Sequence, residues 1–109
     1  MAIEFDDAPQ DCKKAVAQIY NILEAAGYLE TLLEIAPALS LLPARPTLLG
    51  AIWRLGKTAL TARNIRKHTQ GVVKVITRNR IHTICDAQIL RHQGQAALVN
   101  HWRNIRDSF

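Results

Sequence analysis

The sequence predicts an all-α protein, a compact bundle of about five helices. Apolar residues recur at spacings of three and four along most of the chain, as they do on the buried side of an amphipathic helix. Only nine of the 109 residues are Gly or Pro, which excludes a disordered or low-complexity chain. Because a chain of this length forms one core, we expect a flexible acidic lead over residues 1–8 and a single helical domain over residues 9–109.

The first helix is expected to start near Asp7, which can cap it, with Pro9 in the first turn and Asp11 complementing the helix dipole. Its buried stripe is predicted to consist of Cys12, Val16, Ile19, Leu23 and Ala26. Gly27 is well placed to end it. A cysteine on such an apolar face is typical of a small core residue.

A shorter second helix is expected through Leu29, Leu32, Leu33 and Ala36, where Pro37 interrupts it. Residues 39–46 form a connector punctuated by two prolines. Thr47 can cap a third, amphipathic helix that ends at Gln70 and Gly71. Its predicted apolar face contains Leu48, Leu49, Ile52, Trp53, Leu55, Ala59 and Leu60, and its last turns carry Arg63, Arg66 and Lys67.

The secondary structure of residues 72–84 is ambiguous. Their many β-branched residues favour a short β-hairpin that turns at Arg78 and Asn79, but the turn lacks the glycine that such hairpins prefer. The same segment also fits one face of a helix, which we prefer because helices flank it; the hairpin stays open as the alternative. Beyond it, Gly94 is expected to interrupt the helical structure before a last helix that carries Leu98, Val99, Trp102 and Ile105.

Charge is distributed unevenly along the chain. Residues 1–40 carry seven acidic and two basic residues, whereas residues 41–109 carry twelve basic and two acidic ones. The net charge of +5 is therefore the difference between an acidic front and a basic remainder. The basic part either pairs with the acidic helices, within the chain or across a dimer, or attracts an acidic partner.

Residues 51–58 match a relaxed phosphate-binding loop, with Ala51 in place of the first glycine. Because the intervening residues are bulky and set at helical spacing, they cannot curl their backbone N–H groups around phosphates. We therefore expect a chance match inside a helix and no nucleotide cofactor.

The histidines and cysteines do not indicate a metal or catalytic site. His82 and His92 would lie about 15 Å apart on one helix, too far to share an ion with Cys85. His68 and His101 are isolated, and His82, Cys85 and Asp86 do not form a relay on a helix. The sequence therefore predicts no metal, no cofactor and no enzyme activity.

Two cysteines are too few for a disulfide scaffold, the N-terminus is acidic, and the apolar runs are too short to span a bilayer. These observations favour a cytoplasmic protein without a membrane partner.

A DNA-binding regulator of helix-turn-helix or winged-helix type is the alternative function. A basic helix followed by a basic-tipped hairpin would resemble a winged helix. However, the basic residues are spread along the third helix, and no helix-turn-helix signature aligns convincingly.

The preferred function is that of a small non-enzymatic regulator that binds another protein, with a homodimer as an alternative. The chain is rich in leucine between residues 29 and 60, more than one small core readily buries. The partner-binding candidates combine apolar and basic side chains, and they are Leu49, Trp53, Arg54, Lys57, Arg63, Arg66, Lys67, Arg78 and Arg80. Either tryptophan could instead be an ordinary core residue.

Overall fold

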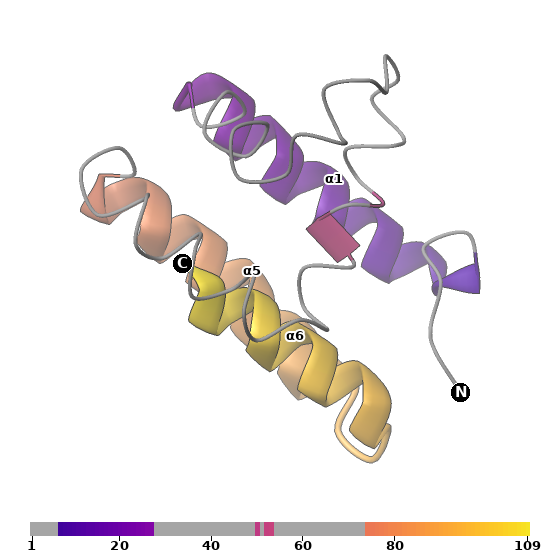
Figure 1. The fold of residues 1–109 in the computed structure, drawn as a ribbon. Helices are drawn as coiled ribbons and strands as arrows, with labels where there is room; N and C mark the ends of the chain where they lie inside the picture. The colour runs from indigo at the N-terminus through magenta and orange to yellow at the C-terminus, as the bar shows by residue number, and fades with distance from the viewer. Residues whose placement is uncertain (1–6, 28–49, 51, 54–73) are drawn as a thin grey trace.

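The computed structural model describes residues 7–27, 50, 52–53 and 74–109 (Figure 1). These residues form helices α1 (Gln10–Ala25), α5 (Val75–Arg91) and α6 (Ala96–Ser108), with a helical piece at 50 and 52–53. No β-strand occurs among them, so the all-α prediction is confirmed for this part of the chain. The expected second helix and most of the third lie outside the described residues.

Helix α1 starts later than expected. Pro9 occupies the N-cap position, its carbonyl oxygen accepts the backbone N–H of Lys13 at 3.1 Å, and no side chain caps the helix. The prediction that Asp7 caps α1 is therefore wrong, because a capping side chain must directly precede the first helical residue. The end is as predicted: Gly27 follows the helix with φ of +73°, a left-handed conformation that glycine adopts without strain.

The residues at which a hairpin would turn, Arg78 and Asn79, lie inside the continuous helix α5. The helical prediction is thus confirmed from Val75 onward, and the hairpin alternative is wrong. The backbone N–H of Arg78 donates to the carbonyl oxygen of Lys74 at 3.0 Å, a helical hydrogen bond at the position where the hairpin would turn. Burial of Ile81 and Cys85 outweighs the strand propensity of the β-branched residues.

Gly94, with φ of +94°, lies in the short connection between α5 and α6, as predicted. The two helices run antiparallel, and α1 lies alongside α5, antiparallel to it (Figure 1). Arg106 of α6 donates from Nε to Oδ1 of Asp86 of α5 at 2.7 Å on the surface. No helix in the described part of the chain is long and apolar enough to cross a membrane.

The core lies between the three helices and is filled by aromatic and branched aliphatic side chains. Trp53 is completely buried, with its ring centroid 3.6 Å from that of His101 and 5.9 Å from that of Trp102. Most of the predicted apolar face of α1 is buried (Cys12, Val16, Ile19 and Leu23), as are Leu98, Trp102 and Ile105 of α6; Ala26 and Val99 are half-buried.

Truncation of the central tryptophan should show how much this core contributes. We expect Trp102→Ala to lower the free energy of unfolding by about 3–5 kcal/mol, because it removes a fully buried aromatic side chain and leaves a cavity. Val75→Ala, at an exposed position of α5, should change it by less than about 0.5 kcal/mol. Urea denaturation measures both, and equal effects would contradict this core assignment.

His82 of α5 is half-buried and faces basic neighbours. Its Nε2 atom is buried without a hydrogen-bond partner among the described residues. Desolvation lowers the pKa of His82 below its ordinary value of 6.5, and the nearby charge of Arg106 lowers it further. The folded state therefore holds His82 neutral where the unfolded chain would already bind a proton.

This pKa shift makes stability depend on pH. The contribution of a neutral His82 is fully present above pH 6.5 and is lost as the pH falls through the folded-state pKa. We expect His82→Gln to reduce the loss of stability between about pH 7.5 and pH 5.5, measured by urea denaturation. An identical loss in wild type and variant would show that His82 titrates alike in both states.

Candidate functional site

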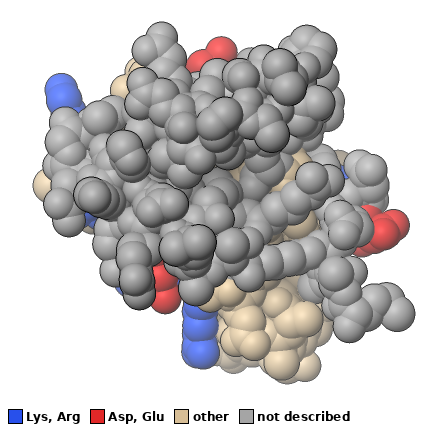
Figure 2. Space-filling model, in the orientation of Figure 1, with Lys and Arg blue, Asp and Glu red and all other residues tan. Residues whose placement is uncertain are grey.

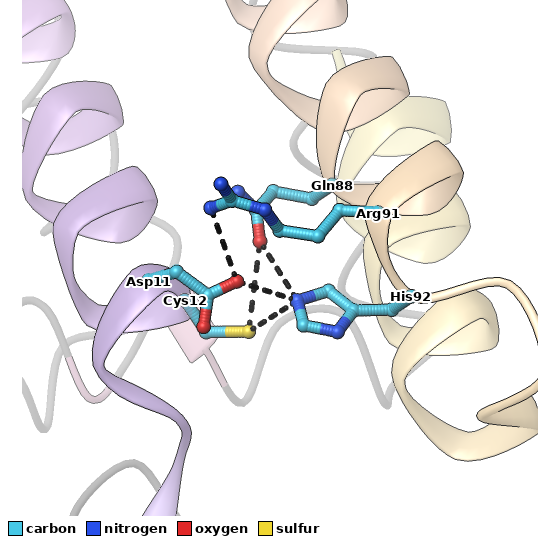
Figure 3. Close-up of polar contacts among 5 residues, drawn as sticks. All are labelled: Asp11, Cys12, Gln88, Arg91 and His92. Atoms are coloured by element: carbon cyan, nitrogen blue, oxygen red, sulfur yellow. Dashed lines mark hydrogen bonds and ion pairs between the residues drawn. The ribbon is translucent and has the colours of Figure 1, made fainter.

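A partly buried polar cluster joins the start of α1 to the end of α5. It consists of Asp11 and Cys12 from α1 and of Gln88, Arg91 and His92 from the last turn of α5 and its C-cap, and we call it the Asp11–His92 cluster (Figure 3). Figure 3 shows the side chains of the two elements directed toward one another across the gap between the helices.

The antiparallel packing of α1 and α5 creates this arrangement, because it places the first turn of one helix beside the last turn of the other. Gln88 and His92 are four residues apart, so both side chains project from the same face. Cys12 belongs to the buried stripe of α1, while Asp11, one residue earlier, reaches the edge of the same interface.

His92 Nε2 is the centre of the cluster. It lies 2.8 Å from Asp11 Oδ2, 3.2 Å from Gln88 Oε1 and 3.5 Å from Cys12 Sγ. Two of these neighbours are oxygen acceptors, so Nε2 carries the hydrogen in this arrangement and donates it to the Asp11 carboxylate. The thiol of Cys12 donates to Gln88 Oε1 at 3.6 Å.

Water is largely excluded from the cluster. Cys12 has no exposed surface, and Gln88 and His92 are also buried. The side chain of Asp11 is 28% exposed, whereas Arg91, whose Nη1 lies 3.5 Å from Asp11 Oδ2, is 61% exposed. The cluster is therefore dry on the side of Cys12 and open to solvent on the side of Arg91.

Burial and polar neighbours act in opposite directions on the pKa values of the two α1 residues. Burial raises the pKa of the Cys12 thiol, an effect that Trp102 only partly offsets. Burial also raises the pKa of the Asp11 carboxyl, but the hydrogen bond and the charge of His92, together with Arg91, outweigh it and the net pKa is lowered. The structure therefore places the Cys12 thiol and the Asp11 carboxylate beside the same imidazole, that of His92.

This pattern does not resemble an activated nucleophile, because a reactive cysteine needs a lowered pKa. The second cysteine, Cys85, is equally buried, and desolvation raises its pKa to about 12. The Asp11–His92 cluster instead gathers one carboxylate oxygen, one sulfur and one imidazole nitrogen, all within 4.8 Å of one another. These are the donor types that hold transition-metal ions in proteins.

Farther along the same pair of helices, a groove of about 550 Å³ runs between the C-terminal half of α1 and the N-terminal half of α5. Polar side chains from both helices edge it, and its described lining residues are Gln18, Asn21, Ile22, Ala25, Arg80, Thr83 and Ile84.

The structure separates the predicted partner-binding residues that it describes. Trp53 is in the core, the alternative that the sequence left open, and offers no surface to a partner. Arg78 and Arg80 lie on α5, half-buried and exposed respectively. The remaining six predicted residues, Leu49, Arg54, Lys57, Arg63, Arg66 and Lys67, lie outside the described residues.

Sequence reasoning missed the Asp11–His92 cluster. It compared His92 with His82 and Cys85, which share its helix but do not belong to the cluster, and it treated Cys12 only as a core residue. The spacing of Gln88 and His92 marks two polar residues on one helix face. No sequence signal connects them to Asp11 and Cys12, about eighty positions earlier.

Comparisons with protein-family models, with curated proteins and with solved structures find no match to this chain.

The polar contacts of the cluster should stabilise the protein unequally. We expect His92→Ala to lower the free energy of unfolding by about 1–3 kcal/mol, because it leaves buried polar groups without their partner. Arg91→Ala should cost less than about 1 kcal/mol, since that side chain is largely solvated. Urea denaturation of the two variants measures this difference, and a larger loss for Arg91→Ala would contradict it.

Proposed function

We propose that this protein is a small, non-enzymatic cytoplasmic regulator that binds another protein. The partner segment would be an amphipathic helix with acidic edges, and it would lie on the outward side of α5. The observation that carries the proposal is the apolar surface on that side of the helix.

Helix α5 has apolar residues on two opposite sides. Its buried residues are only Ile81, Cys85 and Gln88, which form a narrow inner stripe. Val75, Ile76 and Leu90 are 66%, 74% and 69% exposed, the largest exposures of big apolar side chains among the described residues. A surface helix that needed only to cover the core would carry polar residues at these positions.

The exposed residues follow a spacing that suits a helical partner. Ile76, Thr83 and Leu90 are seven residues apart, so they align along the side of α5 opposite its buried stripe, with Arg80 and Ala87 beside them. This row is about 21 Å long, the length of four helical turns. It borders the groove between α1 and α5, because Arg80 and Thr83 also line that groove.

Charge favours an acidic partner over a second copy of the chain. Lys74 and Arg80 are exposed near the N-terminal end of this surface, and neither pairs with an acid in the described part of the chain. Two copies would bring like charges together, whereas acidic residues flanking a partner's apolar side chains would complement them. Leu49, Arg54, Lys57, Arg63, Arg66 and Lys67 remain candidates for extending this surface.

The DNA-binding alternative receives less support. The wing of a winged helix would have been the hairpin at Arg78 and Asn79, where the chain is helical. On the face shown in Figure 2, the visible basic side chains of the described residues lie at separate positions, and acidic side chains are also visible there. Phosphate recognition would instead need them to gather.

Quantitative capture with matched baits tests the proposal. The immobilised wild-type chain, the Ile76→Ser/Leu90→Ser variant and the Arg103→Glu variant are exposed to extract of the source cell. Each retained protein is then purified and titrated by calorimetry. We expect one protein to bind wild type and Arg103→Glu alike, and Ile76→Ser/Leu90→Ser at least tenfold more weakly, because only the double variant removes the apolar contacts.

Arg103 is a matched control because it is an exposed base on α6, a different helix from the one that carries this surface. Arg80→Glu should weaken the same complex, with a loss that is greatest at low salt. The proposal fails if no retained protein distinguishes the baits or if duplex DNA is bound in a salt-dependent manner instead. It also fails if light scattering shows a wild-type dimer that Ile76→Ser/Leu90→Ser converts to a monomer.

A further inference from the structure

We propose that Asp11, Cys12 and His92 form a binding site for a divalent transition-metal ion of the zinc class, which cross-links α1 to α5. This inference is independent of the proposed partner, since the site lies on the inner side of α5 and the partner surface on the outer side.

The ligand atoms already have nearly the spacing that such an ion requires. Bonds of about 2.0 Å to nitrogen and oxygen and about 2.3 Å to sulfur place the donors of a tetrahedral zinc ion about 3.3–3.6 Å apart. Cys12 Sγ lies 3.5 Å from His92 Nε2, and Asp11 Oδ2 lies 2.8 Å from it. All three ligand atoms lie within 4.8 Å of one another, so the site needs an adjustment of Asp11, whose side chain is partly exposed.

The fourth position of a tetrahedron has a neighbour of suitable chemistry. Gln88 Oε1 lies 3.2 Å from His92 Nε2 and 3.6 Å from Cys12 Sγ. It is therefore close to both donor atoms and on the same face of α5 as His92. It can occupy the fourth position or hold a water molecule there. Three protein ligands with an exchangeable fourth are a usual arrangement for zinc.

The donor set selects the class of metal. A thiolate and an imidazole are ligands for borderline and soft ions, so the site favours Zn²⁺ and Co²⁺ over Mg²⁺ and Ca²⁺, which require mainly oxygen donors. Two anionic ligands, Asp11 and the Cys12 thiolate, balance the charge of a divalent ion. Arg91 is largely solvated and can turn away from Asp11 when the ion arrives.

Metal binding would replace protons that now hold the cluster together. The Cys12 S–H proton is released to solvent, and the His92 proton moves from Nε2 to Nδ1, so that Nε2 presents its lone pair to the ion. The buried Nε1 of Trp102 makes no hydrogen bond to a described residue. A metal-bound thiolate at Cys12 would offer this indole N–H an acceptor, since Trp102 already acts on that sulfur.

The ion would link α1 and α5 reversibly. Asp11 and Cys12 belong to the first turn of α1, and His92 directly follows α5, so one ion would bind both helix ends at once. Because the unfolded chain does not hold these three residues together, metal binding would stabilise the folded state in proportion to the logarithm of metal concentration.

Cobalt substitution tests the site directly. The full chain is treated with a chelator, kept reduced with a non-thiol reductant and titrated with Co²⁺. We expect a thiolate-to-cobalt charge-transfer band and the visible absorption of tetrahedral Co²⁺, both displaced by one equivalent of Zn²⁺. Competition with a chromophoric chelator gives the affinity, and thermal unfolding with and without Zn²⁺ gives a rise in Tm.

The chain offers a matched control for each ligand. Cys12→Ser should abolish the charge-transfer band, whereas Cys85→Ser, which removes the other fully buried cysteine, should retain it. His92→Gln should weaken Zn²⁺ binding at least tenfold, whereas His82→Gln should leave it unchanged. Far-UV circular dichroism verifies folding; if Cys12→Ser fails to fold, Asp11→Asn replaces it, at a partly exposed ligand, and should also weaken binding at least tenfold.

The outcomes are decisive in both directions. A band lost with Cys12→Ser and kept with Cys85→Ser establishes the site. A folded wild-type chain without a band, a band that survives Cys12→Ser, or Zn²⁺ binding that depends on His82 and not on His92 overturns it. In that case the Asp11–His92 cluster only connects α1 and α5 by hydrogen bonds.

Discussion

The antiparallel packing of α1 against α5 is the constraint on which the described structure depends. It buries Cys12 and Ile19 of one helix, and Ile81 and Cys85 of the other, in the same core as Trp102. Because the helices run in opposite directions, the packing also brings residues 11 and 12 to residues 88–92, which gathers polar groups at one end of an apolar interface. These groups are tolerated there because they satisfy one another.

Helix α5 gives the protein two distinct surfaces. Its inner stripe contacts the core and ends at His92, where the donor atoms of a metal site converge. Its outer side carries Ile76 and Leu90 into solvent beside Arg80. A metal ion at the inner end would hold α5 against α1 and so make the outer surface more rigid, and a rigid surface loses less entropy when a partner helix binds. The two proposals thus concern one helix but rest on different atoms.

Several features could be predicted from local sequence alone, because their causes are local. Gly27 and Gly94 end their segments since only glycine adopts a positive φ without strain, and the apolar spacing identified most of the buried residues of α1 and α6. The prediction that Asp7 caps α1 was wrong because the helix begins at Gln10, with Pro9 at its N-cap position. The hairpin alternative for residues 72–84 stayed open because β-branched residues suit either structure until packing decides between them.

The sequence by itself determined the helical class of the described residues, the glycines that follow α1 and α5 and the cysteine on the inner face of α1, since hydrophobic spacing and backbone preferences act over a few residues. Only the tertiary structure decided that Trp53 belongs to the core, that the segment from Val75 to Arg91 is one helix, and that His92 meets Asp11 and Cys12. Those outcomes depend on which helices pack side by side and in which direction. That choice depends on how the apolar faces of separate helices bury one another, and no short stretch of sequence contains it.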